Sequence, residues 1–177
     1  TLHSIQGEIK IFKSIAHRHP TPMGKFATEL LVYEEAYDKG EYGNALYHAL
    51  QMKTLAANIP DIGMECELSA RWKVAKALAG MGDFKTAETT YEHIADFIRE
   101  KDLDNEMVNL YEAYKELYQQ MGDQEKAQQY DYLYLKEKDN LFHRSNVEKM
   151  ERSHFVSEIN NVNEQMEQLN AKRRNLW

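Results

Sequence analysis

Histidines and carboxylates are the residues of this 177-residue chain whose chemistry could support catalysis or metal binding. A helical zinc site needs two histidines four residues apart with a glutamate between them, and none of the seven histidines has that spacing. His17 and His19 lie two residues apart, so their side chains point to different sides of a helix. Glu34 and Glu35 are adjacent and diverge in the same way. We therefore predict no metal site, no cofactor and no catalytic residues.

Cys66 is the only cysteine, and it lies in the amphipathic stretch "DIGMECELSARW", where we expect a small core residue rather than a nucleophile. The chain has no glycine-rich phosphate-binding loop and no serine nucleophile elbow. Its formal net charge of −7 argues against a nucleic-acid partner, which requires clustered positive charge. No apolar run approaches the roughly 18 residues of a membrane span. These exclusions leave the binding of a protein or peptide as the expected activity.

Helices must position any binding residues, because helix-forming residues are plentiful while glycine and proline number only 8 and 3. In "LLVYEEAYDKGEY" the apolar residues recur at helical spacing and stop at Gly40, a residue suited to the left-handed position that ends a helix. The same pattern surrounds Gly82 and Gly122, where Asp83 and Asp123 can cap the next helix. The sequence therefore predicts an all-α fold with three helical hairpins.

An alanine follows each turn glycine after five residues, at Ala45, Ala87 and Ala127, and a small residue there lets paired helices pack closely. This pattern resembles the tetratricopeptide repeat over residues 24–137. The period is nearer 40 residues than the family's usual length of about 34, and the Trp and Leu-Gly positions of the first helix are absent. The resemblance implies a helical-hairpin solenoid; a generic hairpin array is the alternative.

Residues 1–19 fit the second helix of a preceding repeat, because one apolar stripe runs along them before Pro20 and Pro22 break the pattern. The stripe comprises Leu2, Ile5, Ile9, Phe12 and Ala16. We accordingly expect the chain to be a piece of a longer protein, with further repeats upstream.

Residues 138–177 change in character, since glycine and proline are absent and polar residues dominate. Apolar residues there recur at alternating spacings of four and three, which is typical of a coiled-coil seam. We expect one long helix that either pairs with a second copy through 155–176 or folds its stripe back onto the last repeat. The predicted seam consists of Phe155, Ile159, Val162, Met166 and Leu169.

The segment "KRRNLW" ends the chain, and basic residues with a tryptophan are typical of a membrane interface. Together with "YLYLKEKDNLF" at 132–142, it resembles the junction in membrane-anchored signal transducers of Bacteroidetes. In that group a periplasmic tetratricopeptide array leads through a helix into the inner membrane, with a histidine kinase or a helix-turn-helix domain beyond. The resemblance implies a membrane just after Trp177 and a periplasmic location; an ordinary solvated helix end in a cytoplasmic protein is the alternative.

The first helices of the hairpins are the expected binding surface, because they line the concave face of such a solenoid. Trp72 is the strongest anchor candidate, and its favoured alternative role is burial between helices. The mildly acidic surface favours a basic or apolar segment of a protein or peptide, including another domain of the same chain. The predicted groove residues are Glu34, Tyr37, Trp72, Lys76, Glu112, Glu116 and Gln119.

Two functional hypotheses follow. In the first, the repeats are the sensor or regulatory region of a bacterial signal-transduction protein, and groove occupancy changes the packing of the C-terminal helix. In the second, the chain is a passive cytosolic scaffold or the repeat region of a soluble transcription regulator.

Overall fold

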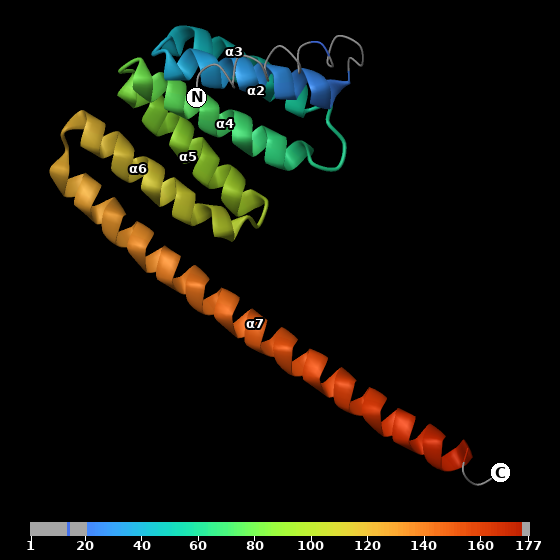
Figure 1. The fold of residues 1–177 in the computed structure, drawn as a ribbon. Coiled ribbons are helices and arrows are strands. Elements are labelled where there is room, and N and C mark those ends of the chain that lie inside the picture. The colour runs from blue at the N-terminus through green and yellow to red at the C-terminus, as the bar shows by residue number, and fades with distance from the viewer. Residues whose placement is uncertain (1–13, 15–20, 175–177) are drawn as a thin grey trace. The chain divides into compact units, whose positions relative to one another are not determined.

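The fold is all-α, as the sequence predicts. A computed structural model describes residue 14 and residues 21–174, and no strand occurs among them. The predicted helix at 1–19 falls almost wholly outside the described residues. The helices are α2 (Pro22–Asp38), α3 (Tyr42–Ala56), α4 (Gly63–Gly80), α5 (Phe84–Glu100), the 3₁₀ helix η1 (Asp104–Glu106), α6 (Met107–Met121) and α7 (Gln124–Arg174) (Figure 1).

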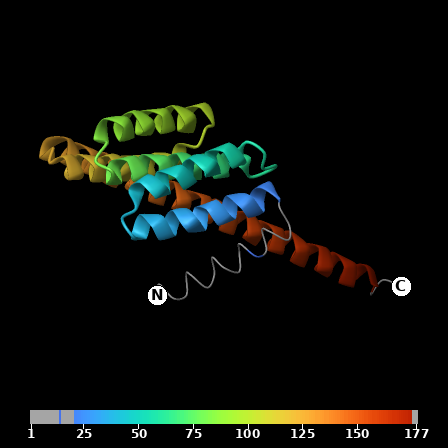
Figure 2. The ribbon, with the colours of Figure 1, turned by 90° about the horizontal axis from the view of Figure 1, so that it is seen from above.

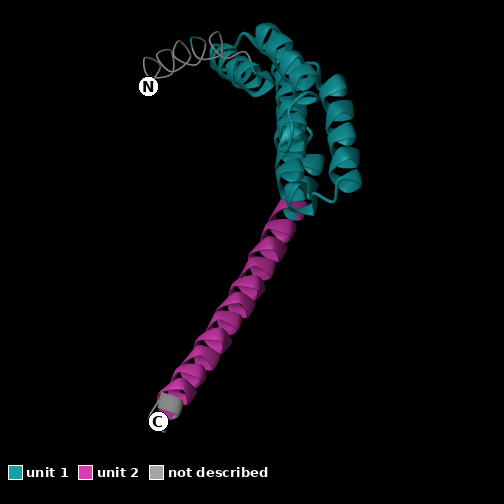
Figure 3. Ribbon diagram, turned by 90° about the vertical axis from the view of Figure 1, so that its right-hand side faces the viewer, with its two compact units in different colours: residues 1–132 teal, residues 133–177 magenta. Residues whose placement is uncertain are grey.

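The chain divides into two compact units (Figure 3). The first unit, Thr1–Tyr132, contains α2 to α6 and the first turns of α7, and the second unit, Leu133–Trp177, continues α7. Within the first unit each of the helices from α2 to α5 contacts the next one along the chain. Two successive views show α2 to α5 running side by side (Figures 1 and 2). The first unit is therefore an array of hairpins stacked in sequence order.

The three predicted turns share one backbone geometry. Gly40, Gly82 and Gly122 have φ values of 75°, 80° and 77°, a left-handed conformation that a side chain disfavours. In each turn the residue after the glycine donates its N–H to the carbonyl five residues earlier, which satisfies a free carbonyl at the helix end. These bonds join Glu41 to Ala36 (2.9 Å), Asp83 to Leu78 (3.0 Å) and Asp123 to Tyr118 (2.9 Å).

Aspartate caps the second helix in two of the three hairpins, as predicted. The Asp83 carboxylate accepts from the Thr86 N–H at 3.3 Å, and Asp123 accepts from the Lys126 N–H at 3.1 Å. A fourth turn of the same type lies between α5 and α6, where Asp102 has a φ of 54°. No glycine marks this turn, so the sequence pattern did not predict it.

Small residues bring the helices together. Ala45, Ala87 and Ala127 are all buried, in agreement with their predicted role at the contact between paired helices. Gly80 adds a second close approach, because a Cβ built on it would lie 2.5 Å from the ring of Tyr42 on α3. The buried residues form two clusters, one between α2, α3 and one face of α4, and the other between α4, α5, α6 and the start of α7.

Candidate peptide-binding groove

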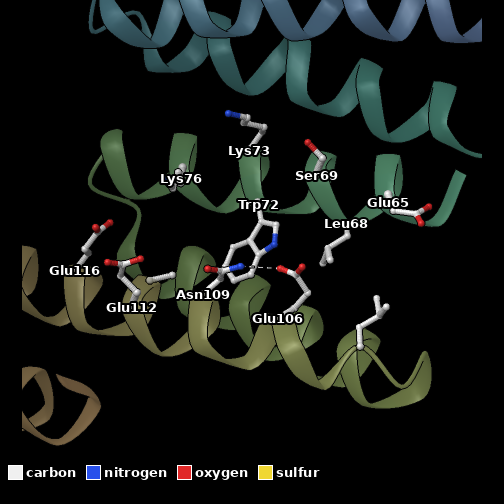
Figure 4. A pocket seen from close by; sticks show the side chains of 12 residues that line it. Glu65, Leu68, Ser69, Trp72, Lys73, Lys76, Glu106, Asn109, Glu112 and Glu116 are labelled. Carbon is white, nitrogen blue, oxygen red and sulfur yellow. Dashed lines mark hydrogen bonds between the residues drawn. The ribbon is translucent and has the colours of Figure 1, made fainter. Parts of the chain in front are cut away.

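A cavity of about 470 Å³ lies between α4 and α6 in the first unit (Figure 4). It is lined by residues that recur every three or four positions on each helix, so two helical stripes face each other across it. We call this cavity the α4–α6 groove. Its lining comprises Glu65, Leu68, Ser69, Trp72, Lys73 and Lys76 from α4, Asn109, Glu112, Ala113 and Glu116 from α6, and Leu103 and Glu106 from the segment before α6.

Trp72 combines the two roles that the sequence left open. Its indole is half-buried and packs against Tyr91 of α5, with the ring centroids 5.8 Å apart. The same side chain lines the groove and projects from α4 toward α6 (Figure 4). Because the core holds one side of the ring, the other side is presented to the groove at little cost in side-chain entropy.

The groove carries net negative charge. Four glutamates and two lysines line it, which gives 2 − 4 = −2. Lys73 pairs with Glu34 of α2 and lies over the ring of Tyr33, so its charge is compensated from outside the groove. The carboxylate of Glu106 accepts a hydrogen bond from the Asn109 amide at 2.8 Å, which orients it at one end (Figure 4). A cationic group would therefore be favoured in the groove.

Four of the seven predicted groove residues meet around this cavity: Trp72, Lys76, Glu112 and Glu116. Tyr37 instead lines a smaller cavity of about 40 Å³, which it shares with Lys76 and Glu116. Glu34 reaches the groove only through its ion pair with Lys73. Gln119 is exposed and lines neither of these cavities, so the structure does not bring it to the groove.

The remaining lining residues were missed. Ser69 and Asn109 lie three residues before Trp72 and Glu112, so helical spacing from the predicted positions could have found them. Leu103 and Glu106 precede α6, and their position depends on the Asp102 turn. No signal in the sequence pointed to that turn.

A chain of aromatic rings leads from the groove into α7. After the contact between Trp72 and Tyr91, the ring of Tyr91 packs against Tyr114 of α6, with centroids 5.5 Å apart. Tyr114 in turn stacks on Tyr130 of α7, with centroids 4.7 Å apart. Tyr118 also stacks on Tyr130, at 5.5 Å, and donates its hydroxyl hydrogen to Glu88. Burial raises the pKa of Tyr91, Tyr114 and Tyr118 above the usual range of tyrosine. These rings therefore stay neutral at any pH near neutrality.

Cys66 is buried, as predicted, and burial raises the pKa of its thiol. The part of the chain that the structure describes holds no group of three metal-binding side chains. Within the same residues, no helix has both the length and the apolar character required to cross a bilayer.

All five predicted seam residues of α7 are exposed. Their exposed fractions range from 45% for Ile159 to 62% for Phe155. The adjoining segment "KRRNLW" falls largely outside the described residues. Comparisons with protein-family models, with curated proteins and with solved structures gave no match, so the function is inferred from the groove and from α7 themselves.

Proposed function

We propose that the first unit is a tetratricopeptide-like domain that binds a protein or peptide segment in the α4–α6 groove. The observation that carries this proposal is the groove itself, in which one half-buried tryptophan lies among four carboxylates. A tryptophan held against the core is a typical anchor of protein recognition, and the groove is large enough for one or two side chains.

The occupant should carry a cation next to an apolar side chain. The cation is attracted by the net charge of the groove and by the face of the Trp72 ring. The apolar side chain would cover Leu68 and Ala113, which lie on opposite walls. An acidic segment is disfavoured because it would bring like charges together in a partly desolvated site.

We further propose that occupancy is relayed to α7, as in a sensor or regulatory region of a bacterial signal-transduction protein on the periplasmic side of the inner membrane. The aromatic chain from Trp72 through Tyr91 and Tyr114 to Tyr130 supports this proposal, because a shift of the indole displaces rings that pack on α7. In a passive scaffold or a soluble regulator, the second hypothesis, binding would leave α7 unaffected.

Fluorescence of Trp72 tests the binding site directly. Trp177→Phe removes the only other tryptophan, so the remaining signal reports on the groove. Short peptides that alternate arginine and leucine are titrated against this variant, with peptides in which glutamate replaces arginine as the comparison. We expect a saturable change with the basic peptide alone.

A charge-matched pair of double variants provides the control. Glu112→Gln with Glu116→Gln should weaken binding of the basic peptide about tenfold, because two attractive charges are lost from the groove lining. Glu100→Gln with Glu125→Gln makes the same change in net charge at exposed positions outside the groove and should leave binding unchanged. Equal weakening by both pairs would show nonspecific attraction and overturn the proposed site.

The relay and the location need separate measurements. Hydrogen exchange of Tyr130 and its neighbours should change when the basic peptide binds, whereas a passive scaffold shows no change. The gene beyond the codon for Trp177 decides the location. A run of about 20 apolar residues there supports the membrane-anchored sensor, and a polar continuation supports the soluble alternative.

A further inference from the structure

The exposed apolar stripe of α7 contributes nothing to the lining of the α4–α6 groove. Phe155, Val162 and Leu169 lie seven residues apart and occupy heptad position d, while Ile159 and Met166 occupy position a. Each of these five side chains is at least 45% exposed, although all are large and apolar. An exposed apolar stripe of this length on a helix marks an interaction surface.

We propose that a second copy of the chain covers this stripe, and that the two α7 helices pair in parallel and in register over residues 155–169. Identical residues then face each other in five successive layers, all of them apolar. The occupant is a second copy because an identical helix in register supplies an apolar side chain opposite each of the five exposed residues.

The number of apolar layers favours the parallel arrangement. In an antiparallel pair each position a faces a position d of the partner, so Phe155 faces Met166 and Ile159 faces Val162. This alignment leaves Leu169 opposite Arg152, and the alternative alignment leaves Phe155 opposite Arg173. Either antiparallel form therefore has four apolar layers where the parallel form has five.

The residues beside the stripe do not oppose the parallel pair. In a parallel coiled coil, position g of one helix lies beside the following position e of the other. Here Glu158 lies beside Asn163, and Gln165 lies beside Asn170, so no like charges meet along these layers. Arg152 and Glu148 occupy the a and d positions before the stripe and end the apolar seam there.

Two valines of α7 give a matched test by light scattering and sedimentation of the full chain. Val162 lies on the stripe and Val147 lies off it, and both are 54% exposed. We expect a mass that rises with concentration toward twice the 20.8 kDa of one chain. Val162→Asp should hold the mass at that of one chain, while Val147→Asp, with the same change in charge and helix propensity, should behave like the original chain. A monomeric original chain, or equal behaviour of the two variants, overturns the proposal.

Disulfide formation tests the orientation. In a Cys66→Ala background, Phe155→Cys should give a covalent dimer under mild oxidation, because the two thiols share a layer in the parallel form. In the antiparallel form position 155 faces position 166, about 16 Å from its own counterpart at 1.5 Å per residue, which is too far for a disulfide. Crosslinking only when Phe155→Cys is mixed with Met166→Cys would overturn the parallel pairing.

The outcome is separable from that of the groove. Val162→Asp leaves every groove residue unchanged, so it should bind the basic peptide as the original chain does. Val162→Asp should therefore abolish the dimer and keep peptide binding. Glu112→Gln with Glu116→Gln should weaken peptide binding and keep the dimer.

Discussion

The two units of this chain are built from the same kind of helix, yet they place their apolar residues differently. In the first unit the large apolar side chains converge in two buried clusters, and Leu110 and Leu117 are each 1% exposed. In the second unit no residue described between 133 and 172 is buried. Helical periodicity predicts helices in both units, but it does not predict whether their apolar residues are buried. The difference lies in the glycine turns: in the first unit they bring further helices alongside, which bury the apolar faces, whereas the apolar residues of the second unit are exposed.

Truncation of a leucine to alanine should give the largest difference in the free energy of unfolding between the two units. Leu117→Ala in the first unit removes a side chain that is 1% exposed, and the resulting cavity should lower the free energy of unfolding by about 2–5 kcal/mol. Leu169→Ala removes the same atoms from a side chain that is 60% exposed and should change it by less than about 0.5 kcal/mol in dilute, monomeric protein. Urea denaturation measures both values, and similar losses would contradict the contrast.

Two glycine substitutions within the first unit should change the free energy of unfolding in opposite directions. Gly122→Ala forces a side chain into a φ of 77° and should lower the free energy of unfolding by about 1–2 kcal/mol. Gly43 is the second residue of α3, and a Cβ built on it meets nothing within 4 Å. Gly43→Ala should therefore raise the same quantity by about 0.4–1 kcal/mol, because alanine has fewer conformations than glycine in the unfolded chain. Thermal unfolding of the two variants gives the comparison, which fails if both move in one direction.

Removal of tyrosine hydroxyls tests whether these polar groups of the first unit gain stability from hydrogen bonds. The Tyr33 hydroxyl is buried without a hydrogen-bond partner, whereas the Tyr118 hydroxyl donates to Glu88. Tyr33→Phe should leave stability unchanged or raise it by up to about 1 kcal/mol, and Tyr118→Phe should lower it by about 1 kcal/mol. Denaturation midpoints of the paired variants measure the difference. A loss in Tyr33→Phe equal to that in Tyr118→Phe would contradict this account.

The smallest effect at neutral pH is the titration of the buried tyrosines. Burial raises the pKa of Tyr91 and Tyr114 in the folded chain, so the folded state holds these protons more tightly than the unfolded state. Their contribution to stability is fully present below about pH 10, the ordinary tyrosine value, and is lost as the pH rises above it. Ultraviolet titration of the folded chain should show tyrosine ionisation above the ordinary tyrosine pKa, which is assigned to Tyr91 and Tyr114 by its loss in Tyr91→Phe with Tyr114→Phe. The absence of any such ionisation would contradict the prediction.

Local signals in the sequence predicted the features that depend on a few neighbouring residues. The turns at Gly40, Gly82 and Gly122 followed from the left-handed preference of glycine, and the capping role of Asp83 followed from the residue itself. The turn at Asp102 uses the same hydrogen bond but was not foreseen, because aspartate rarely takes a positive φ and carries no comparable signal.

The candidate groove was predictable only in part. Trp72 and Glu112 could be placed because spacing fixes which residues share a face of one helix. Which faces meet across a cavity depends on the crossing of α4 and α6, and that crossing is set by packing between residues far apart in sequence. For the same reason the sequence could not decide how much of Trp72 the core would cover.

Gly80 allows α4 to approach α3 closely at the turn end of the hairpins. The ring of Tyr42 takes the space where a side chain would stand on α4, so the two hairpins approach to the width of a single ring. Gly80→Ala would place a methyl group in the space that the Tyr42 ring occupies. The ring would then have to move, or α3 and α4 would have to separate at this contact. The spacing between the first and second hairpins is therefore sensitive to the size of the side chain at position 80.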